Sequence, residues 1–510
     1  MLNILFFQEM HNYFFIISKV CLFSAQSYRG LGEGDKQNMK SPNLCSYPNP
    51  LILPRRSSSS TTHNNAVYAQ QHPSLLTQQH SLRFAVLGAG FVGLSVVWHL
   101  FKQSSKELNL KIDIFDEVGI GGGASGISGG LLHPYSPKGT TFLIFHLQLL
   151  SMDVMVYFLR IVWNVLNDLV KPLWEGSQCW KESIKLLRIA EEASLSKDCT
   201  IEDMKAFVVN KRGILRPAMD MKNMAKLNDN AKTCFPCCRV ETLNDEEAQG
   251  LLPGVLLPFD TAFFMPEALN INPQHYLEAL FRACENLVKE SSCQGSGEKQ
   301  LSLHKKSVYG LSEFEGEYDA VIICLGAKAN TLPEISGRLP LRTCRGVILN
   351  MEPPDITRCY PEHGPSILSD AWIAVESSRS LKVGSTWEWK SINSSPDVSI
   401  DEASNALHEL LPKASTIYPG IKDWVFTGAK AGLRAMPPLT PLGSLPLLGC
   451  INDLIGRNHR CKYWLFGGLG SRGLLYHGWL GNLMAHAALS CNEGVIPSEL
   501  TSWKNINPKF

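Results

Sequence analysis

The clearest pattern of apolar and polar positions lies between Arg83 and Asp116. Phe84 to Leu87 is a short apolar run typical of a buried strand, and Leu94 to Phe101 continues as an apolar helix. Lys111 to Phe115 then forms a second strand. This order of strand, helix and strand predicts the first unit of an α/β domain.

A glycine-rich turn with G-x-G-x-x-G spacing joins the first strand to the helix. Gly88 permits the tight turn, Gly90 lets backbone amides approach a pyrophosphate, and Gly93 allows close helix packing. The phosphates then sit at the positive helix N-terminus, and the acid after the second strand can bond a ribose hydroxyl. Together these features predict dinucleotide binding rather than a chance glycine turn. The residues expected to contact the dinucleotide are Gly88, Gly90, Phe91, Val92, Gly93, Asp116 and Glu117.

Two further strands run into glycine turns. Tyr318 to Asn330 begins as a buried strand that passes into Gly326 and Ala327. Tyr463 to Leu475 is a strand followed by glycines that open a helix from about Leu474 to Leu489, which creates another site for oxygen-rich groups.

The part of the chain between these strands is rich in short strand patterns. Gly346 to Asn350, Trp372 to Val375 and Leu381 to Ser385 alternate with turns, as expected for an antiparallel sheet. Glu402 to Leu411 is expected to be a short surface helix. The fold class is therefore α/β plus α+β, with a discontinuous Rossmann-like domain and a β-rich antiparallel substrate domain.

The expected domain boundaries follow from these patterns. They give a leader at 1–81, a Rossmann-like domain at 82–138, 267–335 and 428–495, an apolar insert at 139–170, a substrate domain at 172–266 and 336–427, and a tail at 496–510.

Composition limits the classes of function. The chain has 510 residues and a formal net charge of +1, which provides no general attraction for nucleic acid. The fifteen cysteines are scattered, and several lie in apolar runs, which favours buried thiols in a reducing compartment. Cys234-x-x-Cys237-Cys238 has no second ligand pair at suitable spacing, so no metal site is expected. The apolar runs are too short for stable membrane insertion.

The leader has the composition of an organelle transit peptide. No acidic residue occurs between Asp35 and Glu107, while basic residues and a run from Ser57 to Thr62 fill the interval. We expect a chloroplast address, with the mitochondrion as the alternative. A disordered tail with no address is the competing interpretation. Translation is hypothesised to begin at Met39, because the preceding segment carries acids.

A second glycine loop, EVGIGGGASGISGGLLHPYSPKG, follows Asp116. Its position directly after the strand that bears the ribose acid favours a second cofactor loop, with Ser125 and backbone amides as donors, over a flexible linker.

The segment GASGISGGLLHPYSP resembles the FAD-dependent D-amino-acid oxidase and glycine oxidase superfamily. Within it, the chain is similar to the C-terminal oxidoreductase half of the bifunctional bacterial enzymes that make methylaminomethyl-uridine at the tRNA wobble position. It looks like an organellar, plant-type homologue of them. The resemblance covers roughly residues 82–138 and 172–510. It implies FAD rather than NAD, and places His133, Pro134 and Tyr135 near the isoalloxazine ring. The further cofactor residues that it implies are Gly123, Ala124, Ser125, Gly126, Gly326, Ala327, Gly468, Gly470, Ser471, Arg472 and Gly473.

The stretch GLRAMPPLTPLGSLPLLG, from Gly432 to Gly449, looks like the superfamily's Gly-x-Arg signature. The match implies that Arg434 binds a substrate carboxylate, which a guanidinium can grip through two parallel bonds. A surface salt bridge is the alternative. Ala435 stands where some relatives carry a flavin-attaching cysteine, so the FAD is expected to be non-covalent. Leu442 replaces a common acid, which leaves the substrate open.

Residues 139–170 are very apolar and have no counterpart in the superfamily. Translated intron sequence or an unusual insertion is the hypothesis, and a core helix is the alternative.

These observations predict a FAD-dependent oxidase or dehydrogenase that oxidises a C–N bond, with molecular oxygen or another electron acceptor. Arg434, Arg472, Tyr135 and His133 are the near-site candidates, and His133, Tyr135 and His477 have packing as the alternative role. The resemblance suggests the carboxymethylaminomethyl group of tRNA as substrate, and a small N-substituted glycine is the second candidate. A non-catalytic FAD-binding assembly factor is the alternative from another class.

Overall fold

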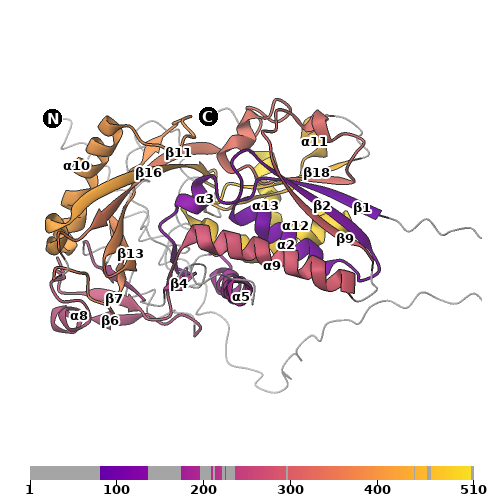
Figure 1. Cartoon of the computed structure of the whole chain (residues 1–510). Helices are drawn as coiled ribbons and strands as arrows, with labels where there is room; N and C mark the ends of the chain where they lie inside the picture. Colours follow the sequence, from indigo (N-terminus) through magenta and orange to yellow (C-terminus); the bar gives the residue numbers. More distant parts are fainter. Residues whose placement is uncertain are drawn as a thin grey trace, which may run out of the picture. The chain divides into compact units, whose positions relative to one another are not determined.

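A computed structural model describes residues 81–135, 174–195, 208–210, 213–220, 224, 236–293, 297–355, 357–440, 443–456 and 461–506 (Figure 1). The predictions for the leader before residue 81, the insert at 139–170, Cys234 and Leu442 lie outside the described residues. Within the described part of the chain, no helix is both long enough and apolar enough to span a membrane.

A six-stranded sheet forms the centre of the predicted Rossmann-like domain. Its inner strands are parallel, because apolar runs buried on both faces suit crossover connections. An antiparallel strand lies at one edge. The order is β17 (Leu447–Cys450), β18 (Lys462–Gly467), β10 (Ala320–Ile323), β1 (Ser81–Leu87), β2 (Asn109–Asp116) and β9 (Lys299–Lys305).

The strand patterns predicted at 84–87, 111–115 and 463 onward are confirmed as β1, β2 and β18. The edge strand β9 was not predicted. Its sequence, KQLSLHK, mixes polar and apolar positions because one of its edges has no partner strand within the described sheet.

Four helices pack together on one side of this sheet (Figure 1). They are α2 (Phe91–Gln103), α5 (Gly176–Ser194), α9 (Pro273–Cys293) and α12 (Gly473–Ser490). Ser95 on α2 donates a hydrogen bond of 2.8 Å to the His477 carbonyl on α12. A Cβ atom on Gly481 would lie 2.2 Å from the Ser95 hydroxyl, so the two helices touch through their smallest side chains.

Helix α5 corrects the predicted domain division. Its segment was assigned to the substrate domain, but Leu186 and Ala190 are buried in the same core as α2 and α12. Ser183 donates a hydrogen bond of 2.8 Å to the Leu475 carbonyl. The amphipathic pattern of α5 predicted a helix correctly, but it carries no information about which sheet the helix covers.

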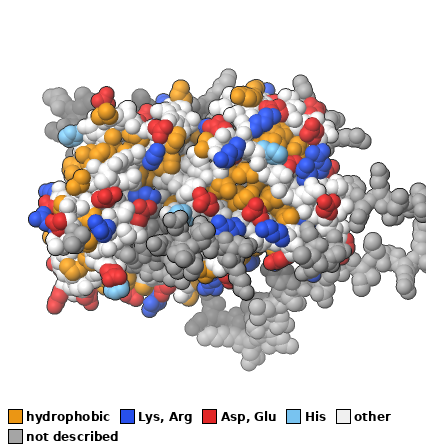
Figure 2. Space-filling model, viewed as in Figure 1, with side chains coloured by type: hydrophobic (Ala, Val, Ile, Leu, Met, Phe, Trp, Pro, Cys, Tyr) orange, Lys and Arg blue, Asp and Glu red, His pale blue; other side chains and the backbone are white. Residues whose placement is uncertain are grey.

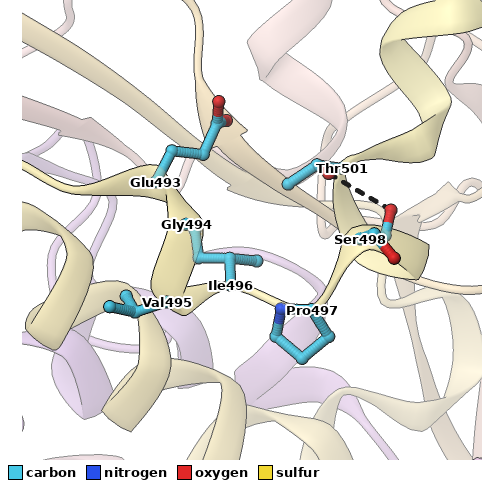
Figure 3. Close-up of a pocket in the computed structure, with 7 residues that line it drawn as sticks. All are labelled: Glu493, Gly494, Val495, Ile496, Pro497, Ser498 and Thr501. Carbon is cyan, nitrogen blue, oxygen red and sulfur yellow. Dashed lines mark hydrogen bonds between the residues drawn. The ribbon is translucent and has the colours of Figure 1, made fainter.

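The other side of the parallel sheet is covered by short elements and by the end of the chain. Trp503 is buried there and donates a hydrogen bond of 2.9 Å to the Leu448 carbonyl. Ile496 and Leu500 are buried in the core shared with the four helices, so the predicted tail is part of the core on both sides of the sheet. An open hollow lies beside it, in which Thr501 donates a hydrogen bond of 3.1 Å to the Ser498 carbonyl (Figure 3). The short elements on that side are α11 (Asn452–Ile455), η2 (Leu311–Phe314) and η7 (Ser502–Asn505), whereas η6 (Glu493–Val495) and α13 (Ser498–Thr501) contribute to the core of the four helices.

A second, mainly antiparallel sheet forms the predicted substrate domain, and its three predicted strand runs are confirmed. Its path is β15 (Glu388–Trp389), β11 (Arg342–Glu352), β14 (Ser380–Gly384), β13 (Trp372–Ser377), β12 (Ser366–Ile367), β5 (Ile214–Pro217), β7 (Ala262–Met265) and β6 (Glu241–Leu243), with β16 (Val425–Met436) paired to β11. Strand β16 therefore belongs to this sheet, although the Rossmann-like domain was expected to resume at 428.

Two helices pack with this sheet, α8 (Asp245–Leu251) and α10 (Ile400–Ile417), and η4 (Pro419–Asp423) follows α10. The predicted surface helix at 402–411 is longer than expected, and Leu410 and Ile417 are fully buried under the sheet. A third, small sheet of β3 (Leu131–Leu132), β8 (Leu269–Ile271) and β4 (Val209–Asn210) joins the two regions.

Candidate active site

The first glycine turn requires glycine at two of its positions for steric reasons. Gly88 has φ +108°, which disfavours any side chain, and its N–H donates a hydrogen bond of 2.8 Å to the Phe115 carbonyl. A Cβ atom on Gly93 would lie 1.8 Å from the Gly88 carbonyl oxygen. The turn therefore exists only with glycine at both positions, as the sequence pattern predicted for a close approach of helix and strand.

Helix α2 begins at Phe91 with its N-terminus in this turn. Gly90 is the N-cap and supplies no side-chain bond, while the Phe91 N–H donates a hydrogen bond of 3.2 Å to the Ser125 hydroxyl. The following N–H groups, of Val92 and Gly93, have no partner within a helix. The turn therefore presents backbone donors and a positive helix end, which suits a pyrophosphate.

Asp116 lies beside the same turn. Its Oδ2 atom accepts a hydrogen bond of 2.9 Å from the Ala89 N–H. Its Oδ1 atom accepts bonds of 3.0 Å and 2.9 Å from the N–H groups of Val118 and Gly119. The carboxylate thus holds the first and second glycine loops together, a role that the sequence did not predict. A carboxylate oxygen has more than one acceptor site, so a ribose hydroxyl can still donate to it.

Because β18, β10, β1 and β2 are parallel neighbours, their carboxyl ends bring three glycine turns to one edge of the sheet. Gly326 (φ +56°) opens η3 (Gly326–Thr331), and Gly470 (φ +57°) opens η5 (Gly470–Arg472). We call the glycine turn after β18, which contains Gly470 and Gly473, the third glycine loop. A Cβ atom on Gly473 would lie 3.4 Å from the Phe91 ring, so the third glycine loop reaches the first glycine turn. Lys328 forms an ion pair with Glu117 across this edge.

The second glycine loop links this edge to the antiparallel sheet. Helix α3 (Ala124–Ile127) packs against β16, and a Cβ atom on Gly432 would lie 3.1 Å from the Ala124 Cα atom. Further along the loop, a Cβ atom on Gly129 would lie 2.5 Å from the Trp372 ring. The second glycine loop therefore packs against the antiparallel sheet, and we call this contact region the junction of the two sheets.

Three of the four nominated catalytic residues line one small cavity. His133, Tyr135 and Arg472 surround it together with Leu131, Ser471, Leu474 and Leu475. The Tyr135 N–H donates a hydrogen bond of 3.3 Å to His133 Nδ1, so a neutral His133 carries its proton on Nε2. The Tyr135 hydroxyl donates to the Cys238 carbonyl, which gives that ring a packing role as well.

Burial and the positive charges of Arg216 and Arg472 lower the pKa of His133 to about 3. The imidazole is therefore a neutral hydrogen-bonding group at physiological pH and not a charged acid. Arg216, which is buried beside it, has its pKa lowered to about 10 by burial and remains protonated.

His477 is a core residue. It is fully buried, its Nδ1 atom is 2.8 Å from the Leu474 carbonyl, and its Nε2 atom is 2.6 Å from the Tyr276 hydroxyl. Burial lowers the pKa of His477 to about 4. The rings of His477 and Tyr276 pack against Phe91, at centroid separations of 5.4 Å and 6.0 Å, and so support the first glycine turn from beneath.

Arg434 lies on β16, opposite Cys344 of β11. Its guanidinium donates hydrogen bonds of 2.8 Å to the Thr386 carbonyl and 3.1 Å to the Ser385 hydroxyl, and its Cζ atom lies 4.1 Å from the centre of the Trp387 ring. Among the described acidic residues, none forms an ion pair with Arg434, so the surface salt bridge expected as the alternative is absent from the described part of the chain. Burial lowers the pKa of Arg434, which makes an uncompensated charge there costly unless an anion accompanies it.

The chemistry of this edge fits a long dinucleotide. Backbone N–H groups and glycines without side chains line the ends of four parallel strands, a carboxylate stands at the second strand, and a guanidinium faces the junction. A family model described as "FAD dependent oxidoreductase" (DAO) matches residues 83–487. The chain belongs to this family. The expected FAD-dependent oxidoreductase and its mixed α/β fold are thereby confirmed.

Solved structures show the same fold at low identity. L-proline dehydrogenase from P. horikoshii is 14% identical with a TM-score of 0.59 and covers 83% of this chain and 98% of that one. Glycine oxidase from Geobacillus kaustophilus is 18% identical with a TM-score of 0.54 and covers 81% and 96%. Iminodiacetate oxidase from Chelativorans sp. BNC1 is 17% identical with a TM-score of 0.54 and covers 80% and 96%.

One curated protein, the uncharacterized oxidoreductase YurR of Bacillus subtilis (strain 168), is 25% identical over 257 residues. The match spans 49% of this chain and 63% of that protein, so the chain covers less than two thirds of this relative.

Several residues near the junction of the two sheets were not predicted from the sequence as part of the candidate site. Ser385, Thr386 and Trp387 contact Arg434, and Trp372 lies against the second glycine loop. The only signal for them is a cluster of small and aromatic residues after β14, which is equally typical of an ordinary turn. Among the described residues, no group of three or more His, Cys, Asp or Glu side chains is arranged to hold a metal ion.

Proposed function

We propose that this chain oxidises the C–N bond of an amino acid or secondary amine whose carboxylate is held by Arg434. FAD supplies the electron sink when bound, since it accepts a hydride. The substrate is thereby converted to an imine, which water hydrolyses to an amine and an α-oxo acid. Every other requirement is positional and falls to the side chains at the junction of the two sheets.

The observation that carries the proposal is the environment of Arg434. The Arg434 side chain is half-buried, its guanidinium lies on an aromatic ring, and it bonds to neutral oxygens of Ser385 and Thr386. Nε donates to Cys344, Nη2 to Thr386 and Arg345, and Nη1 to Ser385, so the second N–H of Nη1 is left to donate a charge-assisted hydrogen bond to a carboxylate. Such a clamp fixes the adjacent C–H bond in one orientation, which lowers the entropic part of the barrier.

The cavity beside Arg472 supports an electrostatic role for that end of the site. Arg472 supplies positive charge, and the neutral His133 supplies a proton donor at Nε2. Both groups would stabilise negative charge that develops on a neighbouring acceptor. Neither is assigned proton abstraction, because His133 is uncharged at neutral pH and its basicity is low. The absence of a cysteine at Ala435, which is buried on β16, supports non-covalent FAD.

The carboxymethylaminomethyl group of tRNA wobble uridine, released as glyoxylate, is the finer proposal for the substrate. The GASGISGGLLHPYSP segment supports it by resemblance. Lys, Arg, Asp and Glu side chains are interspersed over the face seen in Figure 2, so that face presents no extended basic surface for RNA. A small N-substituted glycine satisfies the same clamp. The serine-rich, acid-poor leader supports delivery to a chloroplast, which imaging of a fluorescent fusion of residues 39–81 would test.

Anaerobic mixing of the FAD-loaded protein with glycine, sarcosine, proline and carboxymethylaminomethyl-modified tRNA tests the reaction. Loss of the oxidised-flavin absorbance with at least one of them is expected. Bleaching with modified tRNA alone would establish the RNA substrate. Flavin that stays oxidised with all four would overturn the proposal and favour the non-catalytic assembly role.

Arg434→Met tests the clamp itself. Loss of a charged hydrogen-bonding partner costs about 2–5 kcal/mol, so kcat/KM for the best amine should fall roughly 30- to 5,000-fold with little change in flavin content. Arg434→Lys should lose less activity than Arg434→Met, because lysine keeps the positive charge but lacks the planar guanidinium. Arg358→Met, at an exposed arginine paired with Asp355, is the matched control and should leave kcat/KM unchanged.

A further inference from the structure

The face of the antiparallel sheet that carries Arg434 continues away from the glycine loops. Residues two apart on a strand share a face, so Arg342 and Cys344 of β11 lie on the same side. Cys344 pairs with Arg434 across β16 and with Trp389 across β15, and Arg342 pairs with Met436. These side chains therefore form one continuous surface on three neighbouring strands.

Along this surface two stacked tryptophans lie between two arginines, and we call Arg434, Trp387, Trp389 and Arg342 the Arg–Trp ladder. The Arg434 Cζ atom lies 4.1 Å from the Trp387 ring centre. The rings of Trp387 and Trp389 are stacked, with centroids 5.9 Å apart and 27° between their planes. The Arg342 Cζ atom lies 5.1 Å from the Trp389 ring centre.

The ladder begins at the proposed reaction site. A Cβ atom on Gly470 would lie 3.2 Å from the Met436 side chain, so the third glycine loop touches β16 two residues beyond Arg434. A Cβ atom on Gly346 would lie 2.5 Å from the Arg434 guanidinium, so glycine at 346 leaves room for that group on the surface. A substrate whose carboxylate binds Arg434 would therefore lie next to Trp387, the first ring of the ladder.

The far end of the ladder is open to solvent. Trp389 is 44% exposed, and Arg342 is also exposed. Neither Trp387 nor Trp389 belongs to a hydrophobic core cluster of the described residues, so core packing does not account for the two rings. Arg342 donates a hydrogen bond of 3.3 Å to the Pro437 carbonyl and makes no ion pair with a described acidic residue. An exposed indole that stabilises no core is typical of a binding surface.

We propose that the Arg–Trp ladder binds the substituent on the substrate nitrogen, and that this substituent carries a planar aromatic or heteroaromatic ring. The proposal rests on the proposed function, because Arg434 must hold the carboxylate for the substituent to reach Trp387. The indole faces are covered by each other and by the two guanidiniums, so a planar ring would pack edge-to-face against the exposed part of Trp389 at little conformational cost. A methyl group on the nitrogen is too short to reach Trp389.

N-Benzylglycine and sarcosine separate the two parts of the recognition, because they share the carboxylate and the secondary amine and differ in the ring. With the FAD-loaded protein, kcat/KM should be about 10-fold higher for N-benzylglycine, since packing against one aromatic side chain contributes about this much. Trp389→Leu should remove most of that preference and leave sarcosine unchanged. Equal kcat/KM values for the two amines in the wild-type protein would contradict binding of the ring by the ladder and would not affect the proposed function.

A binding measurement without turnover makes the two failures distinguishable. (Benzylthio)acetate and (methylthio)acetate replace the nitrogen by sulfur and so lack the oxidisable C–N bond. Their Kd values, from perturbation of the flavin absorbance, should differ by about 10-fold in the wild-type protein and be alike in Trp389→Leu. Selective binding of the benzyl compound without bleaching by either amine would keep the ladder's affinity for rings but reject the oxidation. Equal Kd values in the wild-type protein would overturn the ladder.

Ile392→Ala is the matched control, because Ile392 is 91% exposed three residues beyond Trp389 and has no described contact with the ladder. This variant should keep the full preference for the ring. Loss of the preference in Ile392→Ala as well as in Trp389→Leu would mean that the loop, and not the tryptophan, decides it, and would overturn the proposal.

Discussion

The carboxyl edge of the parallel sheet and the face of the antiparallel sheet, which together form the proposed site, are built by different means. The parallel edge is built from backbone: Gly88, Gly93 and Gly470 leave out side chains so that N–H groups and close packing are available. The antiparallel face is built from side chains, with Arg434 and Trp387 projecting from neighbouring strands. A cofactor with a constant shape suits the first, and a variable substrate suits the second.

The comparison teaches where tolerance to substitution lies. A backbone site fails when a Cβ atom is added, because main-chain atoms cannot move aside. A side-chain site fails gradually, because each group contributes its own hydrogen bonds and contacts. Four expectations follow, from the largest effect to the smallest.

Gly93→Val should abolish the cofactor side. Its Cβ atom would lie 1.8 Å from the Gly88 carbonyl oxygen, so α2 cannot keep its position against β1. The purified variant should contain no FAD and should lose more than about 3 kcal/mol of unfolding free energy in urea. Gly250→Ala, where the added Cβ atom meets nothing within 4 Å, is the control and should retain both. A Gly93→Val protein that retains its full content of FAD would contradict the claim that the backbone-built region does not tolerate an added Cβ atom.

Arg345→Met should damage the substrate side while leaving flavin bound. Arg345 is 1% exposed, forms a 2.7 Å ion pair with Glu402, and donates to the carbonyls of Asn393 and Asp397 at 3.2 Å and 3.0 Å. Loss of a buried pairing partner costs about 3–5 kcal/mol, and the loop beyond Trp389 loses its anchor. Urea unfolding and substrate titration measure the two effects. Parallel loss of flavin and of substrate binding would show that the two regions do not fail separately.

Acid should weaken the cofactor side. Burial is the largest cause that lowers the pKa of His99 to about 3, of His133 to about 3 and of His477 to about 4, and the first and last lie on α2 and α12. Because the unfolded pKa is about 6.5, the unfolded state binds more protons below it, and stability falls as the pH drops from about 6.5 toward 4.

For His477 alone the loss reaches about 3 kcal/mol, since each pKa unit corresponds to about 1.4 kcal/mol. Flavin release, followed by its fluorescence, should therefore begin below about pH 6. His477→Gln should flatten the dependence of unfolding free energy on pH, and His408→Gln, on α10, is the control. An unchanged slope in His477→Gln would contradict this assignment.

Ser125→Ala gives the smallest expected effect. Ser125 is a side chain within the backbone-built region, and its hydroxyl accepts a 3.2 Å bond from the Phe91 N–H. Its removal should weaken FAD binding by about 1 kcal/mol, or roughly 5-fold in Kd, because water can replace the lost acceptor. Ser490→Ala, at an exposed helix end, is the control for this titration. A loss as large as that of Gly93→Val would mean that the hydroxyl, and not the backbone, organises the turn.

The sequence predicted the strands and glycine turns of the parallel sheet well because each leaves a local pattern. An apolar run followed by G-x-G-x-x-G requires contacts only between near neighbours, such as Gly88 and Gly93. The interpretation of α5 as part of the substrate domain was wrong because amphipathicity does not name the surface that a helix covers. The assignment of each nominated residue to FAD or substrate stays a prediction.

The sequence by itself determined the first strand, glycine turn, helix and second strand, since the glycines at fixed spacing and the acid at the end of the second strand are encoded within Arg83–Asp116. Only the tertiary structure decided which residues surround the Arg434 guanidinium. Its neighbours Ser385, Thr386, Trp387 and Cys344 lie 47–90 positions away in the chain, and strand pairing alone brings them together. Backbone requirements are local in sequence, whereas a surface built from side chains on paired strands is not.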